Sequence, residues 1–417
     1  MAAVAAPSLH TETKQKRWHD LYPELGTHPL SVDRFTSPTY FERERECIFR
    51  RTWLMVAREE EFRKPGDYLM RDLPVANTSL LLVRGKDQRI RAFHNVCSHR
   101  LNKLVWNRTG NCQVFSCKFH GWSYNTEGRL TFVPDEDQFF DLNKEHLGLT
   151  PVTTDTWEGF VFVNLAPTPQ ETLPEYLGEL GEGLQGYPFS TYAATRYAWR
   201  VEVQANWKVV QDAFQETYHV GVLHRRSLPD SFTSKDNPYS HSFAYKLYKN
   251  HRRLSAYGNP AHQPTPVEQL AMQFGPSINT RDWVLEELPA GVNPERSPYW
   301  STDANSIFPN LVLIVFHGTY ITHQFWPLAA DRTLWEARTY YPQPQNVGQR
   351  FSQEYSKILT RDIFLEDAST VEATQSVLAS GAKQHYTLQD HELLIRHTHK
   401  VIDDWIQGSN GHRGVNP

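Results

Sequence analysis

The stretch Cys97-Ser-His99, followed after seventeen residues by Cys117-Lys-Phe-His120, decides the expected fold of this chain. Each Cys-His pair stands beside a turn, so the four side chains suit either a zinc ion or an iron–sulfur cluster. Zinc fingers carry their two cysteines before their two histidines, whereas a Rieske [2Fe-2S] centre takes one Cys and one His from each of two loops. The order in this chain favours the Rieske cluster.

The composition is that of a globular protein with two or three domains. The 417 residues include 4 Cys and 19 His, and the formal net charge is −4. That charge gives no support to nucleic acid or an anionic membrane as a main partner. Four cysteines are too few for a disulfide scaffold. Outside the motifs, Cys47 lies on an apolar pattern and is expected to be buried, and Cys112 is expected to be an incidental thiol.

The sequence has no pattern typical of a membrane span. Its best apolar runs, such as Leu311–Phe316, are much shorter than the roughly 18 residues that a spanning helix needs. The apolar start, Met1–Pro7, is too short for a signal peptide. We therefore expect a cytoplasmic protein in which residues 1–30 form a loose tail.

Short β-type segments separated by turn signals surround the two Cys-His loops and predict a small antiparallel β domain over residues 55–166. The proline-rich stretch Ala166–Pro169 favours a boundary at its end. Ahead of it, Pro38–Trp53 has the spacing of one amphipathic helix within an N-terminal helical segment, residues 31–54. The strands expected in the domain are Tyr68–Arg71, Ser79–Arg84, Ile90–Phe93, Val114–Cys117, Leu130–Val133 and Phe160–Asn164.

A second group of polar residues follows in the remaining part of the chain. Trp207–His219 is predicted to be a helix, on which Glu216 and His219 share a face with Asp212 one turn earlier. His224 lies about 140° further round an ideal helix, so both histidines can face one metal only if the helix ends or distorts, which Gly221 permits. Two His and one carboxylate on one face of Fe(II) leave positions open for O2 and water.

The elements expected around this group alternate between helix and strand. Residues 225–300 are expected to be irregular, and residues 225–330 with the strands that follow are expected to supply pocket walls. A long helix is predicted from Asn346 to Ala379. Strands are expected at Tyr197–Gln204, Leu311–Ile321 and Leu334–Tyr341. The apolar candidates for the walls, most of them equally suited to a core, are Phe232, Phe243, Tyr245, Phe274, Trp283, Ile307, Phe308, Leu311, Leu313 and Phe316.

The flanks of the first motif, Asn95–Arg100 and Ser116–Tyr124, resemble the Rieske loops of ring-hydroxylating oxygenases. Respiratory-chain Rieske proteins carry an additional Cys in each loop and join the two by a disulfide. The corresponding positions here are Asn102 and Phe119, so no such disulfide is expected. The resemblance implies that the cluster is held by Cys97, His99, Cys117 and His120.

Together with that motif, Asn206-Trp-Lys and Glu216-Thr-Tyr-His219-x4-His224 resemble the catalytic-domain signature of Rieske non-haem iron oxygenases. The resemblance covers nearly the whole chain after its first thirty residues. It implies an α+β protein, with an antiparallel β Rieske domain and a helix-grip (START-like) domain over residues 167–417 that has a curved antiparallel sheet and long helices. The third ligand to Fe(II) in this family is an Asp on a late helix. Asp367 matches that position, and Asp362 is the competing candidate.

The family also places a carboxylate between the cluster of one subunit and the iron of the next. By position this is Glu216, with His120 and His219 as its partners, and Asn206 and Asp212 are further catalytic candidates. Most ring dioxygenases have Asp at this position. The longer Glu resembles the branch that oxidises quaternary ammonium compounds such as carnitine or betaine.

The resemblance implies a terminal oxygenase that uses O2 and electrons from NAD(P)H, delivered by a separate reductase with or without a ferredoxin. Its expected substrate is a hydrophobic, aromatic small molecule, as in aromatic hydrocarbon catabolism. The alternatives are a monooxygenase of quaternary ammonium compounds and an oxidative demethylase. A homotrimer is expected, because cluster and iron within one such chain are too distant for fast transfer. An electron carrier and a zinc-stabilised binding protein remain as non-oxygenase alternatives.

Overall fold

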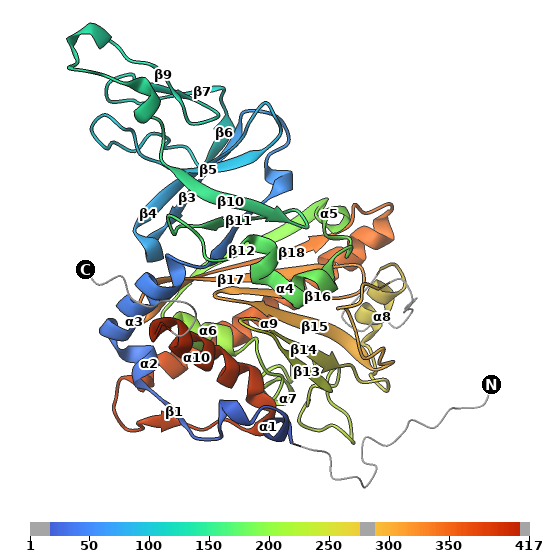
Figure 1. Ribbon diagram of the computed structural model, residues 1–417. Coiled ribbons are helices and arrows are strands. Elements are labelled where there is room, and N and C mark those ends of the chain that lie inside the picture. The colour runs from blue at the N-terminus through green and yellow to red at the C-terminus, as the bar shows by residue number, and fades with distance from the viewer. Residues whose placement is uncertain (1–16, 276–287, 409–417) are drawn as a thin grey trace.

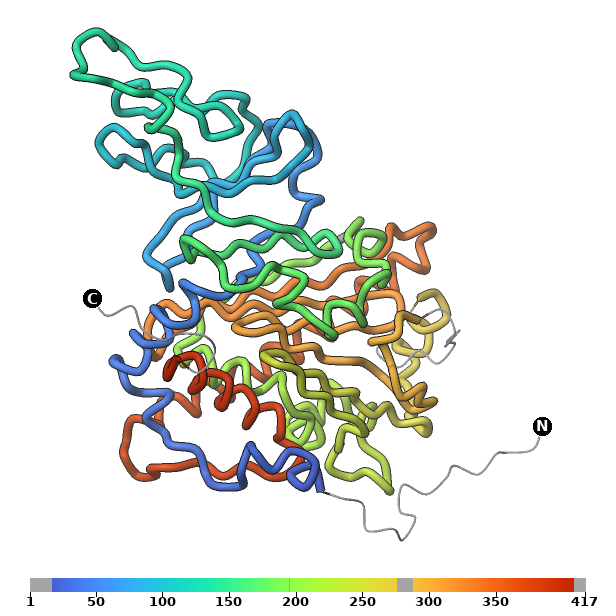
Figure 2. The backbone as a smooth tube through the Cα atoms, viewed as in Figure 1, coloured from blue at the N-terminus to red at the C-terminus, as the bar shows by residue number. Residues whose placement is uncertain are grey.

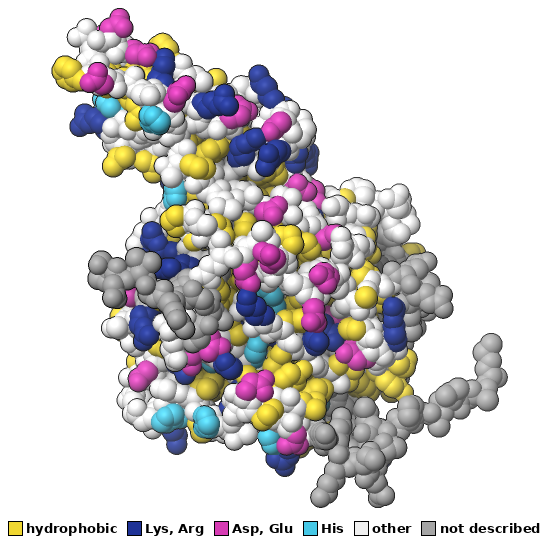
Figure 3. Space-filling view, in the orientation of Figure 1, with side chains coloured by type: hydrophobic (Ala, Val, Ile, Leu, Met, Phe, Trp, Pro, Cys, Tyr) yellow, Lys and Arg dark blue, Asp and Glu magenta, His cyan; other side chains and the backbone are white. Residues whose placement is uncertain are grey.

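The computed structural model describes residues 17–275 and 288–408. The chain forms a smaller β-rich lobe and a larger lobe of sheet and helices, drawn at the top and bottom of Figure 1. The predicted α+β class is confirmed. Basic and acidic side chains are interspersed over the face seen in Figure 3, in keeping with the small net charge. Within the described ranges, no helix is long and apolar enough to cross a membrane.

The smaller lobe consists of two antiparallel sheets. One has the strand order β2-β11-β10-β5-β4-β3-β6 and the other has the order β7-β8-β9. The predicted strands correspond to β3, β4, β5, β7, β9 and β11. The strands are β2 (Trp53–Arg58), β3 (Asp67–Leu73), β4 (Thr78–Arg84), β5 (Ile90–His94), β6 (Thr109–Asn111), β7 (Val114–Ser116), β8 (Ser123–Asn125), β9 (Leu130–Phe132), β10 (Pro151–Trp157) and β11 (Phe160–Asn164).

The larger lobe is built on a curled seven-stranded antiparallel sheet with the order β12-β18-β17-β16-β15-β14-β13. The predicted curved sheet with long helices is confirmed. Its strands are β12 (Thr195–Val203), β13 (Ala244–Leu247), β14 (Arg252–Tyr257), β15 (Trp300–Ile307), β16 (Leu311–Val315), β17 (Tyr320–Ala329) and β18 (Arg332–Tyr341). Its helices are α4 (Leu173–Leu184), α5 (Phe189–Tyr192), α6 (Trp207–Asp212), α7 (Val220–Leu223), α8 (Pro266–Met272), α9 (Val347–Leu378) and α10 (Leu393–Ile406).

Two predictions about this sheet are wrong. Residues 225–300 are not irregular throughout, because β13, β14 and α8 lie among them. The run Leu311–Ile321 is not one strand, since a turn divides it into β16 and the start of β17. Gly318, with φ near +75°, adopts the left-handed conformation in that turn, which an L side chain rarely tolerates. The predicted long helix is α9, and the Asn346 side chain caps its first turn.

The N-terminal segment packs against the C-terminal part of the chain. Residues 17–30 are not a loose tail: α1 (Trp18–Leu21) is held by Asp390, whose carboxylate accepts the main-chain N–H groups of Trp18 and His19. β1 (Leu30–Ser31) pairs with β19 (His385–Tyr386). Figure 2 shows these first and last parts of the trace side by side. Residues 1–16 of the expected tail lie outside the described part.

The helix expected over Pro38–Trp53 is shorter than predicted. After α2 (Asp33–Thr36), α3 (Pro38–Glu44) continues as a π-helical segment to Phe49, and the chain enters β2 at Trp53. Cys47 lies on the π-helical segment and is only half-buried, so its expected full burial is wrong. One apolar cluster joins the lobes, because β2 and β3 contribute to it together with β17 and β18, while a separate cluster lies within the smaller lobe.

Candidate active site

Two neighbouring loops of the smaller lobe carry the Cys-His motifs. Cys97 follows β5, and its main-chain N–H donates to the carbonyl of Asn102. Cys117 follows β7 and exchanges main-chain hydrogen bonds with Gly121 and Trp122, which closes a tight turn before β8. Gly121, with φ near +75°, supplies the left-handed residue that this turn needs. Local turns therefore present one Cys and one His from each loop.

The structure brings the side chains of the two motifs together. The imidazole rings of His99 and His120 have centroids 4.5 Å apart, and His99 stacks on Trp122 at 4.9 Å. The Sγ atom of Cys97 lies 3.3 Å from the hydroxyl of Tyr124. All four cysteines of the chain are free. Asn102 and Phe119 stand where respiratory-chain Rieske proteins have their additional cysteines.

The donor set fits a Rieske cluster. The Nδ1 atom of His99 is buried and has no hydrogen-bond partner, which leaves its lone pair for a metal. Burial raises the pKa of the Cys97 thiol. Burial alone would also raise the pKa of Cys117, but hydrogen bonds from the Phe119 N–H and the Asn102 side chain outweigh it and lower the pKa. A sulfur that accepts N–H groups is stabilised as a thiolate, the form that ligates iron.

The second group of candidates lies in a break between two helices, which differs from the sequence prediction. α6 ends at Asp212 and α7 begins at Val220, so Glu216 lies in an irregular loop and His219 stands at its end. Gly221, at which the helix was expected to be able to end or distort, lies inside α7. His219 precedes the first residue of α7 and His224 follows its last, which lets both imidazoles reach one point.

Tertiary hydrogen bonds explain why the predicted helix stops early. The side chain of buried Gln215 accepts hydrogen bonds from Arg252 and from the Thr398 hydroxyl. The Thr217 hydroxyl donates to the carbonyl of Ser240. These contacts hold the loop out of helical geometry, so that packing overrides the local helix preference.

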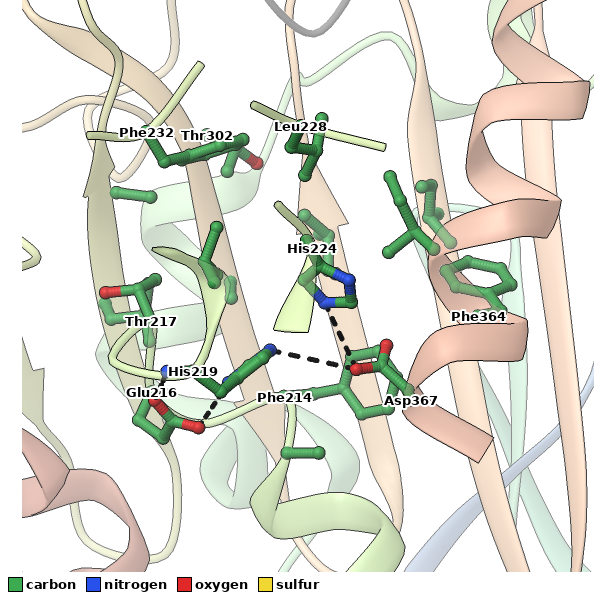
Figure 4. A pocket seen from close by; sticks show the side chains of 18 of the residues that line it. Phe214, Glu216, Thr217, His219, His224, Leu228, Phe232, Thr302, Phe364 and Asp367 are labelled. Carbon is green, nitrogen blue, oxygen red and sulfur yellow. Dashed lines mark hydrogen bonds and ion pairs between the residues drawn. The ribbon is translucent and has the colours of Figure 1, made fainter. Parts of the chain in front are cut away.

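His219, His224 and Asp367 converge on one point, as Figure 4 shows. The Oδ1 atom of Asp367 lies 3.2 Å from His224 Nε2 and 3.7 Å from His219 Nε2. Metal–nitrogen bonds of about 2.1 Å place neighbouring ligands roughly 3 Å apart, close to this spacing. Asp367 is 3% exposed, and its Oδ1 is buried without a hydrogen-bond donor. Two imidazole nitrogens and this unpaired carboxylate oxygen therefore converge as three acceptors, which fits Fe(II) in a two-His, one-carboxylate site.

Each of these imidazoles contacts a second carboxylate through its Nδ1 atom, the ring nitrogen that does not face Asp367. The Nδ1 atom of His219 binds Glu216, whose other oxygen accepts the main-chain N–H of His219 at 3.1 Å. The Nδ1 atom of His224 lies 2.8 Å from Glu366. Both rings thereby turn their Nε2 atoms towards Asp367. Glu366 was not among the expected site residues, because its contact with His224, 142 residues away in the sequence, forms only in the fold.

The three remaining candidates from the sequence, Asp362, Asn206 and Asp212, do not belong to the converging group of ligands. Asp362, about half exposed, forms an ion pair with Arg361 and is not among the converging ligand residues. Asn206 caps α6, accepting the Lys208 N–H and donating to the Ala330 carbonyl, and it lies outside the residues that line the pocket. Its contacts are those of a structural cap rather than of a catalytic group. Asp212 ends α6 and lines a second cavity on the α10 side of the site, together with Glu216, His219 and Asp367.

A pocket opens from the three candidate ligands into the larger lobe, between the sheet and α9 (Figure 4). Apart from Glu216 and the three candidate ligands, its described lining is apolar except for three threonines. Of the wall candidates from the sequence, Phe232 and Phe316 line it, and Trp283 lies outside the described residues. The lining consists of Ala213, Phe214, Thr217, Val220, Leu228, Phe232, Leu254, Ala256, Thr302, Ala304, Ile314, Phe316, Ile321, Thr360, Ile363 and Phe364.

Comparison with known families identifies the two lobes. Residues 189–408, more than half of the chain, match the family described as "Ring hydroxylating alpha subunit (catalytic domain)". The chain belongs to the ring-hydroxylating alpha subunits. Residues 52–153 of this alpha subunit match the "Rieske [2Fe-2S] domain". The predicted pair of a Rieske domain and a catalytic non-haem iron domain is confirmed.

Relatives of this alpha subunit include the carnitine monooxygenase oxygenase subunit of Acinetobacter pittii (strain PHEA-2). The two are 34% identical over 193 residues, 46% of this chain and 51% of the relative. The chain thus spans about half the length of the curated relatives it matches.

Two solved structures share its fold. A quaternary ammonium Rieske monooxygenase is 20% identical, with a TM-score of 0.74 over 93% of this chain and 98% of that chain. Naphthalene 1,2-dioxygenase from Rhodococcus sp. is 21% identical, with a TM-score of 0.72 over 94% of this chain and 97% of that chain. At these identities the likeness concerns the fold of the alpha subunit alone.

Proposed function

We propose that this chain is the terminal oxygenase component of an enzyme that uses O2 and electrons from NAD(P)H to hydroxylate or dihydroxylate a hydrophobic small molecule. One observation carries the proposal: His219, His224 and Asp367 form one end of a pocket whose remaining lining is apolar except for Glu216 and three threonines. Fe(II) bound there would supply the activation of O2, and a cluster at the Cys-His loops would supply electrons. A separate reductase, with or without a ferredoxin, is the proposed electron donor.

The walls of the pocket hold the substrate and exclude water. Four phenylalanines line it, and apolar residues of β14, β15, β16 and β17 form its far side. Such a lining orients a flat apolar molecule by shape, since it offers ring faces and few polar groups. Exclusion of bulk water at the same place limits side reactions of O2.

The polar groups of the pocket favour a neutral substrate. The hydroxyl groups of Thr217, Thr302 and Thr360 each donate their single hydrogen to a main-chain carbonyl. No Lys or Arg is found in the described lining. A substrate carboxylate would therefore lose its hydration without meeting a free side-chain donor, at a cost of roughly several kcal/mol. A neutral, aromatic molecule meets no such cost.

Quaternary ammonium compounds are the second candidate class, whether as substrates of hydroxylation or of oxidative demethylation. The similarity to the Acinetobacter carnitine monooxygenase subunit favours this class, as does the Glu at position 216. The phenylalanine faces could attract a cation. The carboxylate of a zwitterion such as carnitine or betaine would still lack a donor in the pocket.

A substrate panel distinguishes the two classes. The purified chain, supplied with a surrogate reductase, would be tested with benzene and naphthalene, with choline as a cation without a carboxylate, and with carnitine and glycine betaine. Oxygenated product is scored against peroxide. Coupled oxidation of the neutral aromatics alone is the expected result, and coupled oxidation of carnitine or betaine alone rejects the neutral class. A colourless zinc protein without acid-labile sulfide rejects the oxygenase altogether.

We further propose that the active form is a head-to-tail homotrimer in which Glu216 connects His120 of one subunit with His219 of the next. Within one chain, the lobe with β7 and β9 lies at the far end from α6 and α7 (Figure 1), which supports transfer between subunits. Exposed apolar residues occur beside both centres. The cluster surface comprises Leu101, Trp106 and Phe119, and the bridge surface comprises Tyr218, Val222 and Tyr239.

Charges placed on these surfaces test the assembly. Val222, 82% exposed, and Leu101, 77% exposed, would each be replaced by Arg, with Val377→Arg on exposed α9 as the matched control. We expect both surface variants to be monomeric by native mass spectrometry and to make no product, while keeping iron and a reducible cluster. Glu216→Gln, supplied with saturating Fe(II) to offset any weaker hold on His219, should keep the trimer and both metals but lose coupled product. Trimeric, fully active Val222→Arg would reject the interface, and normal turnover of Glu216→Gln would reject the bridge.

A further inference from the structure

Glu366 makes two hydrogen bonds at the back of the candidate iron site. One carboxylate oxygen, Oε2, lies 2.8 Å from His224 Nδ1 and accepts the Ser227 hydroxyl at 2.7 Å. His224 is 3% exposed in its side chain, whereas Glu366 is 24% exposed. The carboxylate therefore reaches solvent on one side, while the imidazole it contacts lies inside the protein.

These contacts determine which nitrogen of His224 is free. An imidazole that donates its Nδ1–H to a carboxylate keeps its lone pair on Nε2, the atom that lies 3.2 Å from Asp367 Oδ1. The hydrogen bond also fixes the rotation of the ring. Carboxylates behind ligating histidines raise the basicity of the imidazole and favour the metal complex.

Glu366 also differs from the carboxylate behind the other histidine. Glu216 is three residues from His219 in the same loop, so their contact is local. Glu366 is 142 residues from His224 and precedes the proposed ligand Asp367 on α9. One short segment of a long helix therefore supplies both a ligand and the group that orients another ligand.

The Ser227 contact extends this link to the substrate pocket. The carbonyl of His224 accepts the main-chain N–H of Leu228 at 2.7 Å, which closes a turn between the two residues. Leu228 and Phe232, a few residues further on, line the pocket. By holding both His224 and Ser227, Glu366 fixes the start of this wall segment against α9.

We propose that Glu366 is a positioning residue of the iron centre, which sets the tautomer and orientation of His224 and couples it to the pocket wall through Ser227. The inference rests on the proposed binding of Fe(II) by His219, His224 and Asp367. On this proposal, the charge of Glu366 and its two hydrogen bonds support metal affinity and ligand geometry. Glu366 is then not merely a surface carboxylate of α9.

Metal binding, rather than turnover, tests the inference. Fe(II) affinity would be measured by competition with a chelator, and ligand geometry by the visible spectrum of the Co(II)-substituted protein. Glu366→Gln keeps the size of the side chain but removes its charge, so we expect a roughly 10- to 100-fold loss of Fe(II) affinity and an altered cobalt spectrum. Asp362→Asn, one turn earlier on α9 and paired with Arg361 rather than with a histidine, is the matched control and should leave both unchanged.

Two further variants keep the test decisive. Ser227→Ala removes one of the two hydrogen bonds of Glu366 at a half-buried position. It should weaken Fe(II) binding roughly two- to tenfold. This variant tests the inference even if Glu366→Gln does not fold. Glu366→Asp should recover part of the affinity. Unchanged Fe(II) affinity and cobalt spectrum in Glu366→Gln, or in Ser227→Ala, overturn the inference. Failure of the unmodified protein to bind Fe(II) would instead reject the proposed function.

Discussion

The ammonium group of Lys208 lies 2.6 Å from the carboxylate of Glu44, and neither side chain is exposed to solvent. Glu44 also accepts the indole N–H of Trp207 at 3.0 Å. Trp207 and Lys208 belong to the Asn206-Trp-Lys segment that resembles the family signature. Their contacts show that this part of the signature joins α3 to the start of α6, which leads into the loop of the candidate iron ligands.

Loss of Glu44 should therefore destabilise the protein strongly. Glu44→Ala leaves the Lys208 ammonium buried without a counter-charge, and we expect a loss of about 3–5 kcal/mol in the free energy of unfolding. Urea unfolding followed by circular dichroism measures the loss. The double variant Glu44→Leu/Lys208→Met removes both charges and should recover most of it. A double variant no more stable than the single one would contradict this account.

Substitution of Asp367 and substitution of Asp362 should have opposite effects on the iron content of the protein. Asp367→Ala removes a buried oxygen that points at both histidines, so we expect loss of the mononuclear iron with the cluster retained. Asp362→Ala alters only an exposed ion pair with Arg361 and should keep both. Iron and acid-labile sulfide analysis, with the absorption spectrum of the cluster, measures both outcomes. Loss of iron in the Asp362 variant alone would reverse the assignment.

An ion pair between the two lobes should make the free energy of unfolding depend on pH in the acid range. Arg71 of β3 and Glu336 of β18 form an ion pair with a 2.5 Å contact. Burial would raise the pKa of Glu336, but the guanidinium groups of Arg71 and Arg338 outweigh it and lower the pKa to about 2. The unfolded value is about 4.3. The pair thus contributes about 3 kcal/mol above pH 4.3, which is lost as the pH falls towards 2.

Glu336→Gln should abolish that part of the pH dependence. We expect the difference in unfolding free energy between the unmodified protein and this variant to be greatest near pH 6 and to shrink steadily on going to pH 3. Urea unfolding at several pH values measures it. A difference that stays constant over this range would show that the carboxylate of Glu336 has an ordinary pKa in the folded protein.

The space in the pocket should be limited by the size of one small residue on β14. Ala256 is buried and lines the pocket, so Ala256→Leu would fill space that a two-ring substrate needs. We expect the KM for naphthalene to rise at least about tenfold and that for benzene to change little, with iron content unchanged. Ala198→Leu on exposed β12 is the control. Equal effects on both substrates would place the substrate elsewhere.

The cluster loops were predictable because their geometry is local. Each Cys-His pair is presented by its own turn, and residues such as Gly121 carry the turn signal in the sequence. The helix α9 was predictable for a similar reason, since its cap and its length follow from neighbouring residues. The strands of residues 225–300 were missed because their many polar residues, including Arg252 and Arg253, find partners such as Gln215 and Glu295 only in the folded protein.

The sequence by itself determined the two kinds of centre and the residue types that each needs, because spacing along a turn sets which side chains can converge. Only the tertiary structure decided the course of the chain from Asp212 to His219, since Gln215 and Thr217 bind partners far away in the sequence. It likewise decided which carboxylates of α9 face the histidines. Residues five apart on a helix point about 140° away from each other, and packing against the loop selected the face that carries Asp367 and left Asp362 in solvent.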